Sequence, residues 1–188
     1  MMIVRRRLVV AAGGTLAAAT FPRKPHAAPV LLTDATPALP AVRPTEPSGE
    51  PLPPFIIRLP DGTERTIADY AGRGVVLNLW ATWCVPCVAE MPALDALAAA
   101  VAGSGVVVLP LSSDRGGVQA VQAFYQAHGI THLPVLLDPA GAASRALGAR
   151  GIPTTLLIDK SGKEHARMEG AAAWDSPASI TMVKRLAL

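Results

Sequence analysis

A chain of 188 residues, of which 51% are hydrophobic, is long enough for one domain with a sizeable core and some sequence that need not belong to it. Its net charge of +3 comes from the start of the chain, because residues 1–33 hold five basic residues and no acidic one. The remainder has 12 basic against 14 acidic residues. The high pI therefore describes the leader, and we expect no nucleic-acid partner.

The first 28 residues have the pattern of an export signal. A basic cluster, Arg5–Arg7, precedes an apolar run of 14 residues at 8–21, which is short for a membrane span of roughly 20 residues. Arg-Arg-Arg-Leu-Val resembles a twin-arginine signal, and Val4 in place of the usual Ser or Thr keeps the Sec route open. We expect residues 1–28 to direct export; the alternative is that 8–21 stays as a membrane tether.

Residues 29–52 have the composition of a linker. Eight of the 18 prolines lie between Pro29 and Pro54, with almost no periodic apolar pattern, which is typical of an extended, poorly ordered tether. The domain is therefore expected at 53–188. It opens with an apolar segment at 55–59, the turn sequence Asp61-Gly62 and residues 63–67, which together predict a short hairpin.

The rest of the domain alternates strands with helices. The patterns predict a strand over 75–80 buried on both faces, then a helix over 85–102 with a kink near Pro92. In chain order there follow a buried strand over 106–111, a helix over 118–128 ended by Gly129, a short helix over 142–147, a hairpin of 154–159 with 164–169, and a last helix over 178–188. This order predicts an α/β sandwich.

The chain has two cysteines, Cys84 and Cys87, spaced C-x-x-C after the buried strand and at the start of the helix. Unpaired backbone N–H groups and the positive end of the helix dipole stabilise a thiolate there, which lowers the pKa of Cys84 from the free value of about 8.5. Cys84 is therefore the expected nucleophile. Cys87, roughly one turn further in, is placed to attack a mixed disulfide at Cys84. Pro86 falls in the first helical turn, where its missing N–H costs nothing.

Two other uses of a cysteine pair fit this chain less well. A structural zinc site needs four ligands, and there is no second cysteine pair; His128 and His132 have a suitable spacing but straddle Gly129 at a helix end. A structural disulfide that closes a loop of two residues constrains the unfolded chain very little. We expect no metal and no cofactor beyond the redox-active Cys84–Cys87 pair, and no histidine shows a spacing or an acidic partner that would make a site.

Two motifs resemble the TlpA/ResA-type branch of the thioredoxins, ATWCVPCVAEMP at 81–92 and GIPTTLLID at 151–159. The resemblance runs from about residue 53 to the C-terminus, and LSSDRGG at 111–117 and Glu169-Gly170 followed by Trp174 belong to it with lower specificity. It implies a thioredoxin fold, in which helices flank a central mixed sheet, with an N-terminal hairpin extension. It also implies thiol–disulfide oxidoreductase activity.

The resemblance assigns further roles around the cysteines. In this family the proline at Pro153 is cis and packs beside the pair, and the adjacent backbone at Ile152 receives a substrate segment by strand-like pairing. Without the resemblance, a trans proline at a strand start is the simpler interpretation. Trp83 is expected at the rim of the active site. The expected substrate-binding residues are therefore Trp83, Pro86, Ile152 and Pro153.

Two polar residues near the cysteines each allow two interpretations. Glu90 lies three residues after Cys87, about one turn along the same helical face. A partly desolvated carboxylate there could relay the Cys87 proton, as the resemblance supports, or Glu90 could be a solvated first-turn acid. Asn78 stands where thioredoxin itself has a buried acid, and we interpret it as a hydrogen-bonded core amide, with a catalytic part as the alternative. Trp80 is expected in the core.

By resemblance, the protein reduces disulfides in cysteine-containing exported or respiratory proteins, in cytochrome c maturation or in copper-site assembly of respiratory oxidases. Its electrons would come from a membrane donor of the DsbD/CcdA type, and its expected location is the periplasm. A general oxidant or isomerase is an alternative, although no segment can hold the helical insertion of a DsbA-like oxidant. A Sco-like copper chaperone is another, but it uses C-x-x-x-C with a distant histidine. A peroxiredoxin has a T-x-x-C motif that is missing here.

Overall fold

The computed structural model describes residues 39–41 and 51–188, and all of these belong to a unit that begins at Thr36. The expected export signal at 1–28, with its apolar run at 8–21, and most of the linker at 29–52 lie outside the described residues. Within the described ranges, no helix is long and apolar enough to cross a membrane.

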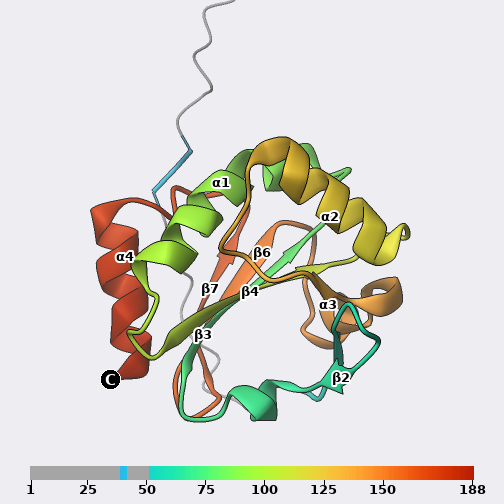
Figure 1. Ribbon diagram of the computed structural model, residues 1–188. Helices are drawn as coiled ribbons and strands as arrows, with labels where there is room; N and C mark the ends of the chain where they lie inside the picture. Colours follow the sequence, from blue (N-terminus) through green and yellow to red (C-terminus); the bar gives the residue numbers. More distant parts are fainter. Residues whose placement is uncertain (1–38, 42–50) are drawn as a thin grey trace, which may run out of the picture. The chain divides into compact units, whose positions relative to one another are not determined.

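A seven-stranded mixed sheet forms the centre of the domain (Figure 1). In sheet order its strands are β2 (Glu64–Arg65), β1 (Ile57–Arg58), β5 (Leu136–Leu137), β4 (Val106–Ser112), β3 (Gly74–Trp80), β6 (Thr154–Ile158) and β7 (Glu164–Glu169). β3 pairs in parallel with β4 and antiparallel with β6, and all seven of its residues are buried. The prediction of a strand buried on both faces is therefore confirmed, and this strand leads directly to the cysteines.

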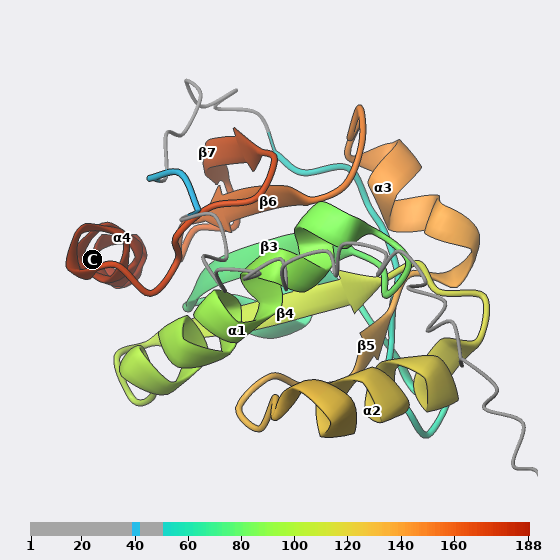
Figure 2. The ribbon, with the colours of Figure 1, turned by 90° about the horizontal axis from the view of Figure 1, so that it is seen from above.

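The helices divide between the two faces of the sheet (Figures 1 and 2). α1 (Val85–Ala100), α2 (Gly117–His128) and α4 (Pro177–Lys184) share a core with Val76 and Trp80 of β3. α3 (Ala142–Ala146) and the N-terminal hairpin share the other core with the odd-numbered β3 residues 75, 77 and 79. Because side chains alternate along a strand, Asn78 lies on the α1 side of the sheet.

The predicted elements are confirmed, with changes at their ends. α1 stops at Ala100, two residues before the predicted end, and α2 ends where predicted because Gly129 takes a left-handed conformation (φ 66°). The last α-helix ends at Lys184, and the chain goes on as a 3-10 helix, η3 (Arg185–Ala187). The hairpin strands are shorter than predicted, since a capping box at Thr66 begins a 3-10 helix, η1 (Ile67–Tyr70), where the second arm was expected to continue.

The sequence patterns missed β5. This strand has two residues, Leu136 and Leu137, and it pairs in parallel with β4 and antiparallel with β1. It therefore joins the N-terminal hairpin to the main sheet, which makes the hairpin an extension of that sheet. Two residues are too few to show a period of two, so pairing in the folded chain is what defines this strand.

Candidate active site

The cysteine pair lies where β3 gives way to α1. Cys84 is the N-cap residue of α1, and its Sγ accepts a hydrogen bond from the backbone N–H of Cys87 at 3.3 Å. The two residues form a disulfide, with their Cα atoms 5.2 Å apart. Cys84 is 6% exposed whereas Cys87 is fully buried. Cys84 thus keeps some exposure whereas Cys87 has none, and the Cys84 sulfur lies at the positive end of the helix.

The turn before α1 is held by Asp114, which follows β4. The Asp114 carboxylate accepts hydrogen bonds from the backbone N–H of Thr82 at 2.9 Å and from its hydroxyl at 2.6 Å. It also accepts one from the hydroxyl of Ser112 at 2.7 Å. β3 and β4 run in parallel and end together, which brings Asp114 beside Thr82. The segment at 111–117 thus orders the loop that presents Cys84.

The loop before β6 approaches the disulfide from the other side. The peptide bond between Ile152 and Pro153 is cis, as the resemblance implies, and the carbonyl oxygen of Ile152 lies 3.5 Å from Cys84 Sγ. A hollow of about 270 Å³ beside this loop is lined by residues 150–154, 169 and 170. Trp83 and Val85, on the α1 side, are 67% and 80% exposed. An apolar rim and the Ile152 carbonyl therefore flank the Cys84 sulfur.

Glu90 is fully buried, and three hydrogen bonds hold its carboxylate. Asn78 Nδ2 donates to Oε1 at 2.9 Å, while the backbone N–H of Ala172 and the indole Nε1 of Trp174 donate to Oε2 at 3.1 and 3.0 Å. Burial raises the pKa of Glu90 to about 7, because the loss of water outweighs these hydrogen bonds, which lower it. The alternative of a solvated first-turn acid is therefore wrong.

Asn78 is the hydrogen-bonded core amide that the sequence led us to expect. Besides its bond to Glu90, Nδ2 donates to the Thr155 hydroxyl oxygen at 2.9 Å, across the register pair of β3 and β6. Its Oδ1 has no partner among the described residues. Trp80 is a core residue, as expected: it is fully buried and stacks on Tyr125 with ring centroids 6.0 Å apart.

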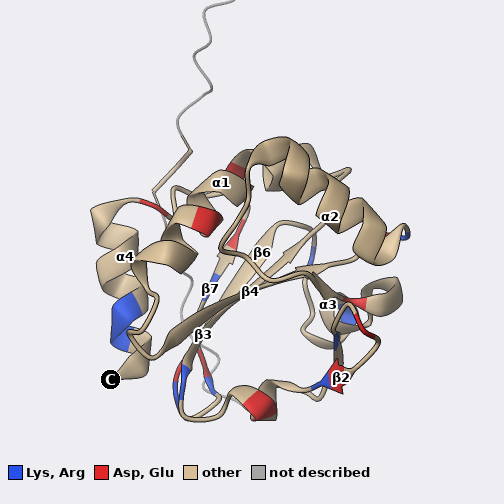
Figure 3. Ribbon diagram, in the orientation of Figure 1, with Lys and Arg blue, Asp and Glu red and all other residues tan. Residues whose placement is uncertain are grey.

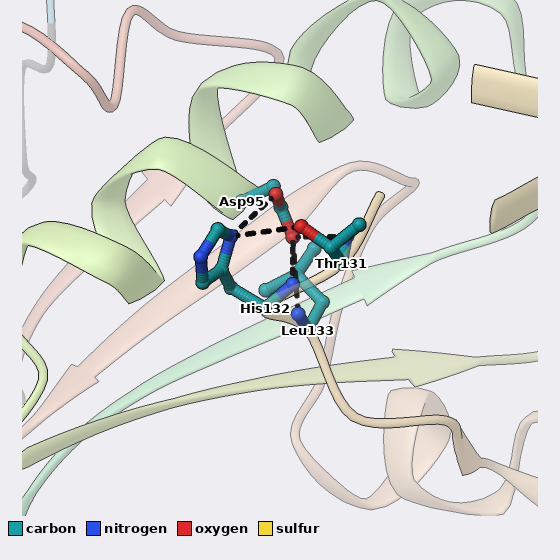
Figure 4. A network of polar contacts seen from close by, with 4 residues as sticks. All are labelled: Asp95, Thr131, His132 and Leu133. Atoms are coloured by element: carbon teal, nitrogen blue, oxygen red, sulfur yellow. Dashed lines mark hydrogen bonds and ion pairs between the residues drawn. The ribbon is translucent and has the colours of Figure 1, made fainter. Parts of the chain in front are cut away.

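One histidine contact was not visible in the sequence. His132 does have an acidic partner, since its Nδ1 lies 3.0 Å from Asp95 Oδ2 (Figure 4). Asp95 Oδ1 also accepts the backbone N–H groups of Thr131, His132 and Leu133, at 3.1, 2.7 and 3.0 Å. His132 is 37 residues from Asp95, so no local spacing could show the contact. The network ties α1 to the segment before β5 and includes neither cysteine.

The sequence missed two donors to Glu90, the Ala172 N–H and the Trp174 indole, and the Thr155 hydroxyl that binds Asn78. Thr155 lies in the motif at 151–159, but the motif did not say what its side chain contacts. Trp174 is 84 residues from Glu90. The only sequence signal for Trp174 was its position after Glu169-Gly170 in the TlpA/ResA-type resemblance. This resemblance predicts no hydrogen-bond partner for the indole.

The model of the Redoxin family matches residues 47–180. The chain belongs to the Redoxin family. It is 36% identical over 115 residues to the thiol-disulfide oxidoreductase ResA of Geobacillus thermodenitrificans, an alignment that covers 61% of this chain and 65% of that protein. The resemblance to TlpA/ResA-type sequences is thus confirmed.

Solved structures of Redoxin-like proteins share the fold. A thiol:disulfide interchange protein of the thioredoxin family from Chlorobium tepidum has a TM-score of 0.59 at 26% identity, covering 76% of this chain and 97% of that one. The exposed lipoprotein thioredoxin of Streptococcus pneumoniae has a TM-score of 0.58 at 30% identity, covering 70% and 98%. The predicted thioredoxin fold is confirmed. Together, the fold, the family and the Cys84–Cys87 disulfide are those of a thiol–disulfide oxidoreductase.

Proposed function

We propose that this Redoxin protein is an exported thiol–disulfide oxidoreductase that reduces disulfides in partner proteins. The observation that carries the proposal is the position of the Cys84–Cys87 disulfide, at the N-terminus of α1 and 3.5 Å from the Ile152 carbonyl oxygen. Cys84 keeps some exposure and Cys87 has none, which is the asymmetry that attack followed by resolution needs.

The reaction transfers two electrons from the cysteine pair to the partner. In the reduced protein the Cys84 thiolate attacks one sulfur of the partner disulfide; a bond forms between them, and the second partner sulfur leaves as a thiolate that takes up a proton. Cys87 then loses its proton and attacks Cys84 Sγ. The Cys84–Cys87 bond forms, the mixed disulfide breaks, and the first partner sulfur leaves and is protonated.

Glu90 is proposed to accept the proton that Cys87 loses. It lies three residues further along α1, and residues three apart share one face of a helix. A pKa of about 7 lets the carboxylate take up a proton and release it near neutral pH. Because the group is fully buried, this proton does not have to pass directly from Cys87 to bulk water.

The partner segment is proposed to lie along the Ile152–Pro153 loop as an extended strand. Pro153 lacks an N–H, so the carbonyl of Ile152 is the group that can accept a hydrogen bond from the partner backbone. Trp83 and Pro86 border the same sulfur on the α1 side, with Trp83 largely exposed. These residues supply apolar contact without specifying one partner sequence.

The proposed setting is the periplasm, in cytochrome c maturation or in copper-site assembly of respiratory oxidases. The leader pattern at 1–28 and the likeness to an exposed lipoprotein support export. The TlpA/ResA-type motifs support the pathway, the cysteine-containing exported or respiratory partners and a membrane electron donor of the DsbD/CcdA type. Two cysteines suffice for the exchange, so no further cofactor is proposed.

A trapping experiment in the native compartment tests this function. Cys87→Ser leaves the attack intact and removes the resolving thiol, so partners should accumulate as mixed disulfides with Cys84. Few species are expected, among them cysteine-containing respiratory proteins. Cys84→Ser is the matched control and should trap nothing, because Cys87 is buried. A broad set of unrelated secreted proteins would instead indicate a general oxidant or isomerase.

Copper titration of the reduced protein tests the copper chaperone. The proposed reductase should reduce a protein disulfide stoichiometrically, with or without a copper chelator. A chaperone should bind copper through both thiols and reduce the disulfide poorly. Copper binding that is lost in Cys87→Ser, together with an absence of disulfide reduction by the native pair, would contradict the proposal.

A further inference from the structure

We propose that Trp174 is a positioning residue of the redox site, which fixes where Glu90 carries its proton. Its indole N–H and the backbone N–H of Ala172 hold Glu90 Oε2 as a hydrogen-bond acceptor, so that the proton is taken up at Oε1, beside Asn78. The inference deepens the proposed function, in which Glu90 accepts the proton of Cys87. It assigns Trp174 a role that acts through Glu90.

Both hydrogen-bond partners of Glu90 Oε2 are donors, so a proton on this atom would have no acceptor. Trp174 is fully buried in the segment between β7 and α4, and its Nε1 lies 3.0 Å from Oε2, while the Ala172 nitrogen lies 3.1 Å from the same atom. An indole N–H and a backbone N–H only donate. An O–H at Oε2 would face two N–H groups and find no acceptor. Oε2 is therefore an acceptor in both protonation states of Glu90.

Oε1 has a different kind of neighbour. Its one partner is the Asn78 side chain, 2.9 Å away, and an amide has both donors and an acceptor. With Glu90 ionised, Nδ2 donates to Oε1, and Oδ1 is left without a partner. Rotating the amide by half a turn brings Oδ1 to the protonated Oε1 and to the Thr155 hydroxyl, and leaves Nδ2 in the unpartnered place. Asn78 Oδ1, which lacks a donor when Glu90 is ionised, thus accepts hydrogen bonds when Glu90 is protonated.

The titration near neutral pH belongs to Glu90. Burial raises the pKa of Glu90, while Asn78 from β3 and the donors at Ala172 and Trp174 lower it, and no charged side chain of the described residues acts on it. Thr155 from β6 reaches it only through Asn78. Cys87, on the same helix, does not titrate while it is in the disulfide. The oxidised protein therefore isolates the carboxyl.

The test compares two tryptophans in the oxidised full-length protein. Trp80 is as fully buried as Trp174, but its Nε1 has no partner among the described residues. W174F and W80F therefore remove the same N–H group and a similar volume, and only W174F removes a donor to Glu90. We follow the Glu90 carboxyl carbon by ¹³C NMR against pH. W174F should raise its midpoint by about one pH unit, since a hydrogen bond to the ionised form is lost; W80F should leave it unchanged.

Equal midpoints in W174F and W80F would overturn the inference. If W174F does not fold, the native protein still tests it: the ¹H–¹⁵N signal of the Trp174 indole should move with the Glu90 midpoint, and the movement should vanish in E90Q. An indole signal that does not respond to pH overturns the inference as well.

Rates of thiol–disulfide exchange, measured against pH on the reduced proteins, separate the role of Trp174 from the proposed proton transfer to Glu90 on which it rests. If W174F shifts the carboxyl midpoint and the rate profile together, both are supported. A shifted midpoint with an unshifted rate profile supports the positioning role of Trp174 and counts against Glu90 as the proton acceptor.

Discussion

Two acidic residues of α1 have opposite electrostatic behaviour. The helix carries Glu90 and Asp95 and no basic residue (Figure 3). Both are buried, at 0% and 9% exposure, and both accept several hydrogen bonds. Burial raises the pKa of Glu90 to about 7 in spite of its three donors. For Asp95 burial also acts to raise the pKa, but hydrogen bonds from His132 and from the N–H groups at 131–133 outweigh it, and the net pKa is lowered.

The difference shows that burial by itself does not decide the charge of a carboxyl group. Asp95 has four donors, and its partner His132 is about half-exposed, so the site keeps contact with water. Glu90 has three donors and no contact with water. One helix thus carries a carboxylate that fastens a loop in its ionised form and a carboxyl group that is poised to exchange a proton.

The largest expected effect is on the pH dependence of stability in E90Q. The raised pKa means that the folded state binds the Glu90 proton more tightly than the unfolded state. Stability should therefore fall as pH rises from about 4.5 to about 7, by about 3 kcal/mol in total. Gln cannot ionise, so E90Q should lack this fall. Urea denaturation of the native protein and E90Q at pH 5 and pH 8 measures this fall. If the free energy of unfolding changed equally with pH in the two proteins, the raised pKa would not belong to Glu90.

D95N should show the opposite sign with a smaller effect. A lowered pKa stabilises the folded state above the unfolded pKa of Asp95, and the contribution is lost as pH falls through the folded pKa. Asn keeps one acceptor oxygen but loses the charge, so we expect a loss of about 2 kcal/mol at pH 7. In strongly acidic solution the native protein and D95N should have similar stability. Thermal unfolding at both pH values tests this.

T155V should have an intermediate effect, confined to the cluster around Glu90. Val keeps the shape of Thr and removes the oxygen that accepts the second Asn78 N–H, so one buried donor loses its partner. We expect a loss of about 1 kcal/mol. The Asp95 network should not respond, so the same loss should be found when T155V is made in the D95N background. Strong coupling between the two changes would show that the acids are not independent.

The smallest expected effect is that of H132A. The contact of His132 with Asp95 is about half-exposed on the histidine side, and such contacts contribute less than about 1 kcal/mol. The three backbone N–H groups stay bonded to Asp95 Oδ1. Hydrogen exchange at Thr131 and Leu133 should therefore remain slow in H132A and become fast in D95N. Fast exchange in both variants would assign the stabilisation to the ring instead.

The fold was largely predictable because its signals are local. The buried run at 75–80, the glycine stop at Gly129 and the hairpin at 154–169 each depend on neighbours in the chain, and all three are confirmed. β5 was missed, since a two-residue strand exists only through its pairing with β4 and β1. The second arm of the N-terminal hairpin was predicted too long, because a local capping box at Thr66 begins η1 there.

The candidate site also has one part that the sequence predicts and another that depends on the tertiary structure. The chain order by itself determined the C-x-x-C pair after a buried strand, and with it the helix terminus that activates Cys84, because these residues are adjacent in the sequence. The surroundings of Glu90 were decided by the tertiary structure. Asn78, Ala172 and Trp174 reach the carboxylate from positions 12, 82 and 84 residues away, on one strand and one loop. A pKa depends on burial and on donors in space, so the sequence could name the acid but only the folded chain could make it a carboxyl group that titrates near neutral pH.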